Sequence, residues 1–401
     1  MKIVKLLGIL LVANVVFCVG GCSKDEPGNT NITSSFDPAF ALELQKRGYV
    51  KDASNITVDD VKDIEELDVS GKGYDSDLQD YVYGDLTSLR GIEYFKSLKK
   101  LNCELNKVTS LDVSRNTSLE ALICWRNQLN ALDVSKNTSL VDLSCSHNQL
   151  ISLNVCRNKD LEHLSCGENK LGSLDVSKNT KLIELYCDRN QLKTADVSNN
   201  IELTELSCEV NQLSTLDVSN NLALNRLICF SNQLNTLDVS KNTALEVLWC
   251  FNNQLGTLDV SKDVALKYLY CYENQLSTLD VSQNDALITL ECSYNQLKTL
   301  NVTQNMALEA ISCVHNQLSF LDVSQNTALK SLGCYNNQLR TLDISKNIVL
   351  ECLECNINPG DGSGVFPVTA WFGNDAVPSD FTKGAWDFNG QLVTIDYRKA
   401  E

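Results

Sequence analysis

The chain has 401 residues, of which 43% are hydrophobic and 21% are charged, a balance typical of folded rather than disordered proteins. Its formal net charge is −17, so its surface repels nucleic-acid phosphates and anionic lipids. The composition therefore excludes nucleic-acid binding from the expected functions.

Residues 1–21 have the layout of a secretory signal peptide. Lys2 and Lys5 form a short positive region, an apolar stretch occupies residues 6–19, and two glycines follow it. This apolar stretch is short for a membrane span, and no other run of eighteen apolar residues occurs. We therefore expect export of the chain and no transmembrane helix.

The sequence VGGC at residues 19–22 resembles a bacterial lipobox, with Val in place of the commoner Leu at its first position. The resemblance implies that Cys22 is acylated and becomes the mature N-terminus, and that Ser23 after it directs the protein to the outer membrane. Lys24-Asp25-Glu26 then resembles the surface-export signal of bacteroidete-type lipoproteins. The alternative is an ordinary signal peptide with an incidental cysteine. Residues 22–35 are rich in Ser, Asn, Thr and Gly and predict a flexible tether.

An N-terminal cap with degenerate repeats is expected over residues 36–97. Its first segment, FDPAFALELQKRG, predicts a short helix because Pro38 stands near the start and Gly48 at the stop. The segment IEELDVS at residues 64–70 is a degenerate first repeat, and an irregular stretch follows it.

A repeat of 21 residues, without insertions, occupies residues 98–358. Leucines stand two and five residues before a cysteine, and an asparagine three residues after it. Leucines follow at five and eight residues, valine at ten and a second asparagine at thirteen, as in Leu245-x-x-Leu248-x-Cys250-x-x-Asn253. The repeated cysteines are Cys103, Cys124, Cys145, Cys166, Cys187, Cys208, Cys229, Cys250, Cys271, Cys292, Cys313, Cys334 and Cys355.

This unit resembles the 21-residue bacterial leucine-rich repeat, LxxLxLxxNxLxxLDLxxNxx, with cysteine replacing one core leucine. The resemblance implies a leucine-rich-repeat solenoid with a curved parallel β-sheet on its concave face. Its convex side is expected to be mostly irregular or short and extended. An N-terminal helical cap and a C-terminal β cap complete the expected fold.

Elementary physics explains the repeated positions. Leu-x-Cys has a period of two, so both side chains point to one face of a short strand. One unit alone cannot bury its apolar side chains, whereas stacked units bury them against each other. Buried asparagine both donates and accepts hydrogen bonds, which suits a ladder of inward-turned backbone.

Residues 359–401 are expected to form the C-terminal β cap. The sequence PGDGSG at residues 359–364 ends the repeat, and residues 386–397 predict a hairpin with an Asn389-Gly390 turn.

The cysteine ladder is interpreted as buried free thiols. Parallel strands hold neighbouring Cβ atoms farther apart than the ~3.8 Å of a disulfide, and zinc needs ligands that converge on a point. Cys352 and Cys355 form a CxxC whose members face opposite sides of a strand, and Cys156 has no evident partner.

An aspartate column, from Asp112 and Asp133 onward, is interpreted as exposed turn carboxylates, often near lysines such as Lys136; a calcium ladder is the alternative. The three histidines, His147, His163 and His315, are expected at exposed strand positions. The sequence contains no nucleophile-base-acid arrangement or phosphate-binding glycine loop. We expect no enzyme activity, no catalytic residues, no metal site and no cofactor.

The variable positions that flank each cysteine are the expected ligand-binding residues of the concave face. They are acidic in the middle repeats and aromatic after them, and such patches usually mark interaction sites. The acidic residues are Glu168, Glu184, Asp188, Glu205 and Glu209, and the aromatic ones are Phe230, Trp249, Phe251, Tyr268, Tyr270, Tyr272, Tyr294 and Tyr335. The alternative is that stacked aromatics only stabilise neighbouring strands.

The sequence thus predicts a cell-surface binding module, adhesin-like or receptor-like, of a Gram-negative outer membrane. We expect a protein or peptide partner with a basic segment. The acidic half of the concave face, formed by the acidic residues of the middle repeats, would attract this segment. Membrane contact is expected only through the N-terminal lipid. A surface glycan-binding protein and a structural spacer without a ligand are the alternatives.

Overall fold

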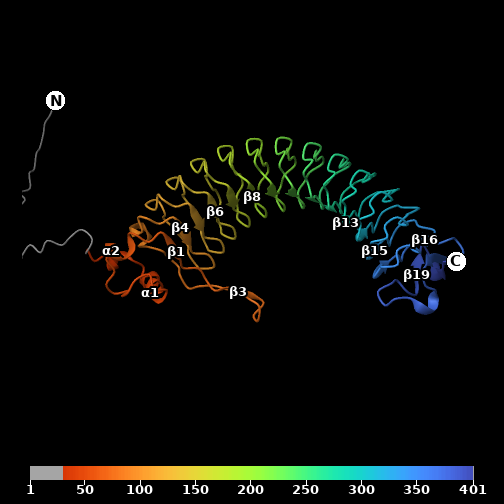
Figure 1. Ribbon diagram of the computed structural model, residues 1–401, viewed down its shortest axis with the longest axis horizontal. Coiled ribbons are helices and arrows are strands. Elements are labelled where there is room, and N and C mark those ends of the chain that lie inside the picture. Colours follow the sequence, from red (N-terminus) through yellow and green to blue (C-terminus); the bar gives the residue numbers. More distant parts are fainter. Residues whose placement is uncertain (1–29, 401) are drawn as a thin grey trace, which may run out of the picture.

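The computed structural model describes residues 30–400, which form one arched solenoid with strands along its inner side (Figure 1). The predicted signal peptide, the predicted acylation site Cys22 and the first part of the predicted tether lie outside the described residues. Within the described part of the chain, no helix is long and apolar enough to cross a bilayer.

The N-terminal cap contains the predicted helix, α1 (Pro38–Lys46). Asp37 is its N-cap, and its Oδ1 accepts hydrogen bonds from the Ala39 and Phe40 amides at 2.9 and 3.3 Å. The helix buries Phe40 and Leu44 in the first layer of the core, and a short second helix, α2 (Val58–Val61), follows it. The predicted helical cap is therefore confirmed.

The cap begins before residue 36, the start that the sequence pattern predicts. Ile32 is buried, Asn31 pairs with Thr57 in an isolated β-bridge, and Thr33–Ser35 forms a 3₁₀ turn, η1. The expected tether therefore ends before Asn31, because Ile32, the one large apolar residue of that polar stretch, is buried in the core.

The degenerate first repeat forms β1 (Glu66–Asp68), which pairs in parallel with β4 (Lys100–Asn102). The stretch expected to be irregular between them contains an antiparallel hairpin, β2 (Gly73–Asp75) and β3 (Asp80–Val82), and the 3₁₀ turn η2 (Ile92–Tyr94). The hairpin projects from the arch on its concave side (Figure 1).

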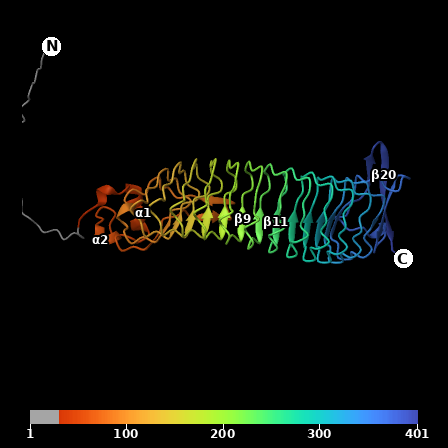
Figure 2. The same ribbon diagram turned by 90° about the horizontal axis from the view of Figure 1, so that it is seen from above.

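Fourteen short strands form the parallel sheet of the concave face, in the order of the chain. Their register aligns the central leucines, so that Leu227 lies opposite Leu248, for example. Figure 2 shows these strands side by side along the solenoid. After β1 and β4 they are β5 (Ala121–Ile123), β6 (Asp142–Ser144), β7 (His163–Ser165), β8 (Glu184–Tyr186), β9 (Glu205–Ser207), β10 (Arg226–Ile228), β11 (Val247–Trp249), β12 (Tyr268–Tyr270), β13 (Thr289–Glu291), β14 (Ala310–Ser312), β15 (Ser331–Gly333) and β17 (Cys352–Glu354).

The thirteen repeated cysteines line the core directly behind this sheet. Each is at most 1% exposed, and all fifteen cysteines between residues 30 and 400 are free thiols. Burial raises the pKa of the Cys103 and Cys145 thiols to about 12, so these groups are neutral at physiological pH. The cysteines therefore act as small apolar residues that fill the core.

The first asparagine of each repeat turns into the core and holds three carbonyl groups at once. Asn253 is an example: its Nδ2 donates to the carbonyls of Cys229, Cys250 and Phe251 at 3.1, 3.1 and 3.3 Å. Its Oδ1 accepts from the Leu234 amide at 3.0 Å. Each asparagine thus links its own turn to the preceding one.

The second asparagine forms a separate ladder on the convex side. Asn137 Nδ2 donates to the carbonyls of Val113 and Asn116 at 2.9 and 2.8 Å, and the same bonds recur in later repeats. At one position of this column the asparagine is replaced by Asp263, which is fully buried.

The residue two after each cysteine adopts the left-handed backbone region, with φ between +47 and +55° in all thirteen repeats. The sequence did not reveal this feature, because glycine occupies none of these positions. The conformation turns the chain inward at the following asparagine, and costs an L-residue about 1–2 kcal/mol.

The C-terminal cap is a four-stranded sheet in the order β16-β18-β20-β19. Its strands are β16 (Leu342–Asp343), β18 (Val365–Ala370), β19 (Ala385–Phe388) and β20 (Gln391–Lys399). The predicted hairpin is confirmed, since β19 and β20 are antiparallel and Asn389 and Gly390 both have positive φ. Trp386 Nε1 donates to the Asn358 carbonyl at 2.9 Å, which seals the last repeat.

Replacement of Asp263 by asparagine is predicted to stabilise the protein increasingly as pH rises from about 4 to about 7. Both carboxyl oxygens of Asp263 are buried without a hydrogen-bond partner, and burial raises its pKa to about 7. The unfolded chain binds fewer protons over this range, so the carboxyl destabilises the folded state as pH rises. The pH-dependent gain of Asp263→Asn reaches on the order of 3–4 kcal/mol at neutral pH.

The measurement is chemical unfolding of both proteins between pH 4 and pH 8. The control is Asp285→Asn, an exposed aspartate on the same convex side, for which no such trend is expected. A stability difference for Asp263→Asn that stays constant across this range would show that the buried carboxyl does not titrate in the folded state.

Val210→Asn is predicted to stabilise the protein by about 1 kcal/mol, because Val210 is a β-branched residue at φ 51° and asparagine tolerates this region better. Thermal unfolding measures the change. Val264→Asn, at an exposed position without positive φ, serves as the control and is expected to give no gain. A lower melting temperature for Val210→Asn would contradict the role assigned to backbone strain.

Candidate binding surface on the concave face

The strands present two side chains to the concave side for each one that enters the core. In β11 the central Leu248 is buried, while Val247 and Trp249 on either side of it are partly exposed. Residues one and two after each cysteine extend this surface. Because successive units stack in register, every variable position becomes a column that runs along the arch.

Two of these columns hold a continuous aromatic platform on β10 to β12. Phe230, Phe251 and Tyr272 stack face to face, with ring centroids 4.1 and 4.2 Å apart and interplanar angles of 10 and 11°. In the next column Trp249 stacks on Tyr270, with a centroid distance of 5.3 Å and an interplanar angle of 10°. The structure thus brings together five of the predicted aromatic residues, all of them partly exposed.

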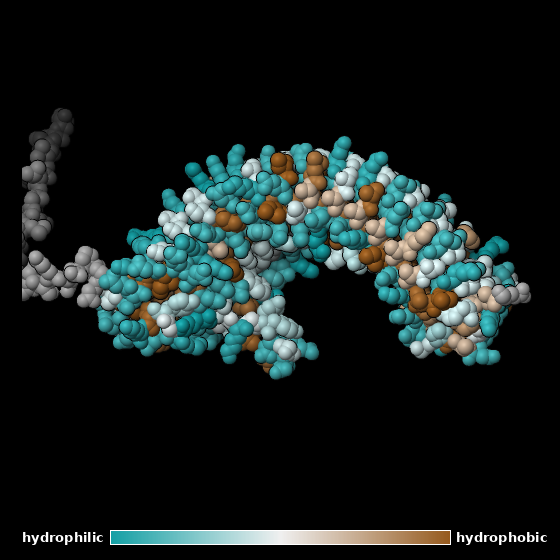
Figure 3. Space-filling view, viewed as in Figure 1, coloured by the Kyte–Doolittle hydropathy of each residue, from teal (hydrophilic) through white to brown (hydrophobic). Residues whose placement is uncertain are grey.

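Tyr268 and Tyr294 border this platform, whereas Tyr335 lies farther along the arch, where its ring meets His315 edge to face at a centroid distance of 5.3 Å. Tyr268 is 37% exposed, and Tyr294 is 47% exposed and stacks on His315 at 4.3 Å. The guanidinium of Arg226 lies over the Trp249 ring at 5.2 Å. In the side view of Figure 3 most of the surface is hydrophilic, and hydrophobic residues occur in separate groups along the arch.

The predicted acidic residues lie on or shortly after the neighbouring strands β7 to β9, and three of them, Glu168, Glu184 and Glu205, lie within 4.0 Å of a basic side chain. His163 Nδ1 lies 3.2 Å from Glu184, and Arg226 Nε lies 4.0 Å from Glu205. The Tyr186 hydroxyl donates to Glu205 at 2.8 Å, and burial together with this carboxylate raises the pKa of the phenol. Tyr186 therefore remains a neutral donor within this group.

Asp188 and Glu209 form no ion pair within the described chain. Ser207 Oγ donates to Glu209 at 2.5 Å. Burial, followed by the like charge of Glu209, raises the pKa of Asp188 to about 6. The acidic half of the surface thus retains two uncompensated carboxyl groups.

An aromatic cluster that was not predicted from the sequence lies at the N-terminal end of the same surface. Tyr81 of the hairpin meets Trp125 edge to face at 5.7 Å, and the guanidinium of Arg126 lies over the Tyr81 ring at 4.0 Å. Trp125 directly follows a cysteine, as do Phe230 and Phe251, so the repeat pattern contained a signal for it.

The expected placement of the histidines is partly wrong. His163 lies in β7, but His147 and His315 follow their strands at left-handed positions with φ of 51°. His147 Nδ1 lies 2.9 Å from Glu168, and burial lowers the pKa of His147. These two side chains therefore sit at the edge of the concave face rather than on its strands.

The aspartate column has a backbone role. Asp133 Oδ1 accepts from the Ser135 amide at 2.8 Å, as Asp112 does from the Ser114 amide at 2.9 Å. Hydrogen bonds from the hydroxyl and the amide of these serines lower the pKa of both carboxyls. Such turns account for the column without a cation. Among residues 30–400 no group of three or more His, Cys, Asp or Glu side chains is placed to hold a metal ion.

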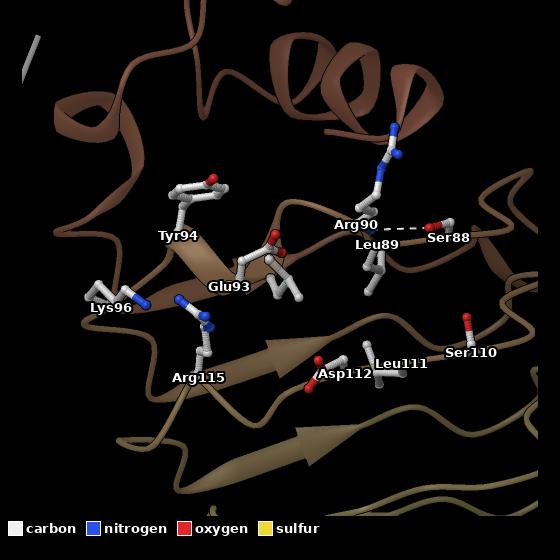
Figure 4. Close-up of a pocket in the computed structure, with 11 residues that line it drawn as sticks. Ser88, Leu89, Arg90, Glu93, Tyr94, Lys96, Ser110, Leu111, Asp112 and Arg115 are labelled. Carbon is white, nitrogen blue, oxygen red and sulfur yellow. Dashed lines mark hydrogen bonds between the residues drawn. The ribbon is translucent and has the colours of Figure 1, made fainter. Parts of the chain in front are cut away.

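A cleft of about 620 Å³ lies between the N-terminal cap and the first full repeat, outside the concave sheet (Figure 4). Arg90, Lys96 and Arg115 line it together with Glu93 and Asp112. Two of these side chains already form hydrogen bonds with the backbone. Arg90 donates to the Phe36 carbonyl at 3.0 Å, and Glu93 accepts from the Gly91 amide at 2.8 Å. None of the predicted binding residues lies there.

The curved parallel sheet, the cysteine ladder and the asparagine ladder together define a leucine-rich-repeat solenoid, a class that uses its concave surface for binding. No model of a protein family and no curated protein matches the sequence. Solved structures do match it. The functional domain of InlJ from Listeria monocytogenes, described as including a cysteine ladder, is 31% identical with a TM-score of 0.75, over 86% of this chain and 83% of that one.

The chain therefore belongs to the bacterial leucine-rich-repeat proteins. A leucine-rich-repeat protein of Leptospira interrogans is 27% identical with a TM-score of 0.66, over 75% of this chain and 86% of that one. The internalin InlF of Listeria monocytogenes, 19% identical with a TM-score of 0.62 over 77% and 98% of the two chains, shares the fold.

Proposed function

We propose that this protein is a cell-surface binding module that captures a protein or peptide with its concave face. The aromatic platform, defined as Phe230, Phe251, Tyr272, Trp249 and Tyr270, is the observation that carries the proposal. Its rings stack along the solenoid and leave partly exposed edges toward the concave space. Aromatic residues supply much of the binding energy at protein interfaces, and they lose little side-chain entropy on binding.

The acidic half extends the proposed binding surface toward the N-terminus. Glu184 and Glu205 lie on the adjacent strands β8 and β9, and Asp188 and Glu209 lie two residues after the ends of these strands, in a chain whose net charge is −17. A partner that combines an apolar anchor with a basic segment would complement both halves of the surface. The stacking itself stabilises the sheet, so the platform has a structural contribution beside its proposed binding role.

The location at the cell surface is part of the same proposal. The lipobox-like sequence ending at Cys22 and the polar residues after it support attachment to the outer membrane by an N-terminal lipid. In this arrangement the solenoid is attached to the membrane at its N-terminal end, and the concave face is accessible to a partner. Labelling of intact cells with radioactive palmitate, with and without Cys22→Ser, tests the lipid anchor directly.

The double variant Trp249→Ala, Tyr270→Ala is predicted to weaken partner capture by at least about thirtyfold, since removal of even one such ring from an interface centre costs about 2 kcal/mol. The measurement is capture of proteins of the host or neighbouring cells by immobilised residues 23–401, which include both caps and every repeat. Titration of the captured protein against the unmodified chain and against the double variant then gives the change in affinity.

Phe320→Ala is the matched control, because Phe320 is an exposed aromatic that lies outside the positions flanking the cysteines. Unchanged capture by the double variant would contradict the proposal and favour a spacer without a specific ligand. Release of the bound material by a polysaccharide, but not by salt, would identify a glycan as the ligand instead.

A further inference from the structure

A small cleft in the concave face separates the missed N-terminal aromatic cluster from the acidic half. Its volume is about 270 Å³, and it lies over strands β6 to β8. Ligand pockets for whole small molecules are usually larger, about 300–1,000 Å³, so this cleft has the size for a single side chain.

The cleft exists because two columns that are bulky elsewhere are small here. Its floor consists of Ser144, Ser165 and Ser146, where the aromatic platform has Trp249, Tyr270 and Phe251 in the same columns. Ser146 Oγ and Ser165 Oγ are hydrogen-bonded at 2.8 Å, which leaves a polar floor.

Aromatic rings form the two ends of the cleft. Trp125 closes it on the N-terminal side and Tyr186 on the C-terminal side. Each is held by a carboxylate: Trp125 Nε1 donates to Glu104, and the Tyr186 hydroxyl to Glu205. An aromatic ring attracts a nearby cation, and the Arg126 guanidinium already lies 5.4 Å from the Trp125 ring centroid.

Asp188 enters the cleft over Gly167, the only glycine in the column that follows the cysteines. A Cβ atom at residue 167 would lie 2.3 Å from Asp188 Oδ1, so a larger residue there would displace the carboxylate. The absence of a side chain at Gly167 thus makes room for this acid.

The charge of the cleft is negative and only partly compensated. Glu168 lines the cleft beside Asp188. Its Oε2 lies 2.9 Å from His147 Nδ1, and its Oε1 lies 3.7 Å from Arg189 Nε. Asp188 has no ion pair within the described chain, and burial with the like charges of Glu209 and Glu168 raises its pKa to about 6. A bound cation would relieve this repulsion.

We infer that this cleft is a specificity pocket for one cationic side chain of the partner, with arginine preferred. Two aromatic ends suit the flat faces of a guanidinium, while Asp188, Glu168 and the serine hydroxyls accept its hydrogen bonds. The inference deepens the proposed function, because it assigns the basic segment of a peptide partner to a defined place beside the aromatic platform.

The test uses N-acetyl-arginine amide as the probe and its neutral isostere N-acetyl-citrulline amide as the matched control. Ligand-observed NMR against residues 23–401 measures both at millimolar concentrations. The arginine probe is expected to bind at least about tenfold more tightly, because citrulline keeps the shape and loses the charge. Asp188→Asn is expected to reduce binding of the arginine probe by a similar factor.

Glu273→Gln is the control variant, since Glu273 is exposed and occupies the same column as Glu168 outside the cleft. Ser146→Phe is a second variant that fills the cleft with a residue that this column accepts at Phe230 and Phe251. Equal binding of citrulline, competition by N-acetylglucosamine, or full binding by Ser146→Phe and Asp188→Asn would overturn the inference.

The outcome is separable from that of the proposed function. The variant Trp249→Ala, Tyr270→Ala leaves the cleft intact and is expected to bind the arginine probe as the unmodified chain does. If the probe fails to bind while the platform variant loses partner capture, the cleft inference falls and the proposed function stands. If the probe binds and the platform variant keeps full capture, the assignment of the platform falls instead.

Discussion

The solenoid depends on the need to satisfy the backbone groups that each turn carries into the core. Buried carbonyl and amide groups without partners cost about 1–3 kcal/mol each, and a chain that turns inward thirteen times would accumulate many of them. The repeated asparagine meets this need: Asn253 alone serves three carbonyls and one amide from two adjacent turns. Cysteine, leucine and valine then fill the space around this polar ladder.

The same ladder gives the concave face its organisation. Because each asparagine joins its turn to the preceding one, the strands stack without a shift in register, and residues 21 apart become spatial neighbours. Phe230, Phe251 and Tyr272 therefore form a stack, and Ser144 and Ser165 form a shared floor. Variation at a few positions changes the surface locally, with aromatic rings at one place and a small acidic cleft at another, while the core remains constant.

The sequence predicted those features that follow from periodicity. The sheet, the buried cysteines and both caps are confirmed, as is the Asn389-Gly390 turn. The β2–β3 hairpin was not predicted, because it interrupts the repeat and lacks its pattern. The left-handed position after each strand was hidden by side chains that do not favour it, such as Val210. The cleft beside Asp188 depends on which residues are small in neighbouring repeats, and only the stacked structure brings Gly167 and Asp188 together.

Hydrogen exchange of the Asn253→Ala variant tests most directly whether the asparagine ladder holds the solenoid and its binding surface in register. The account predicts a large loss of protection at the Leu234 amide, which donates to Asn253, and in the adjacent strands β10 and β11. The control variant Asn225→Ala, at an exposed site without a side-chain hydrogen bond, should leave protection unchanged. Protection in Asn253→Ala equal to that of the control would contradict the account.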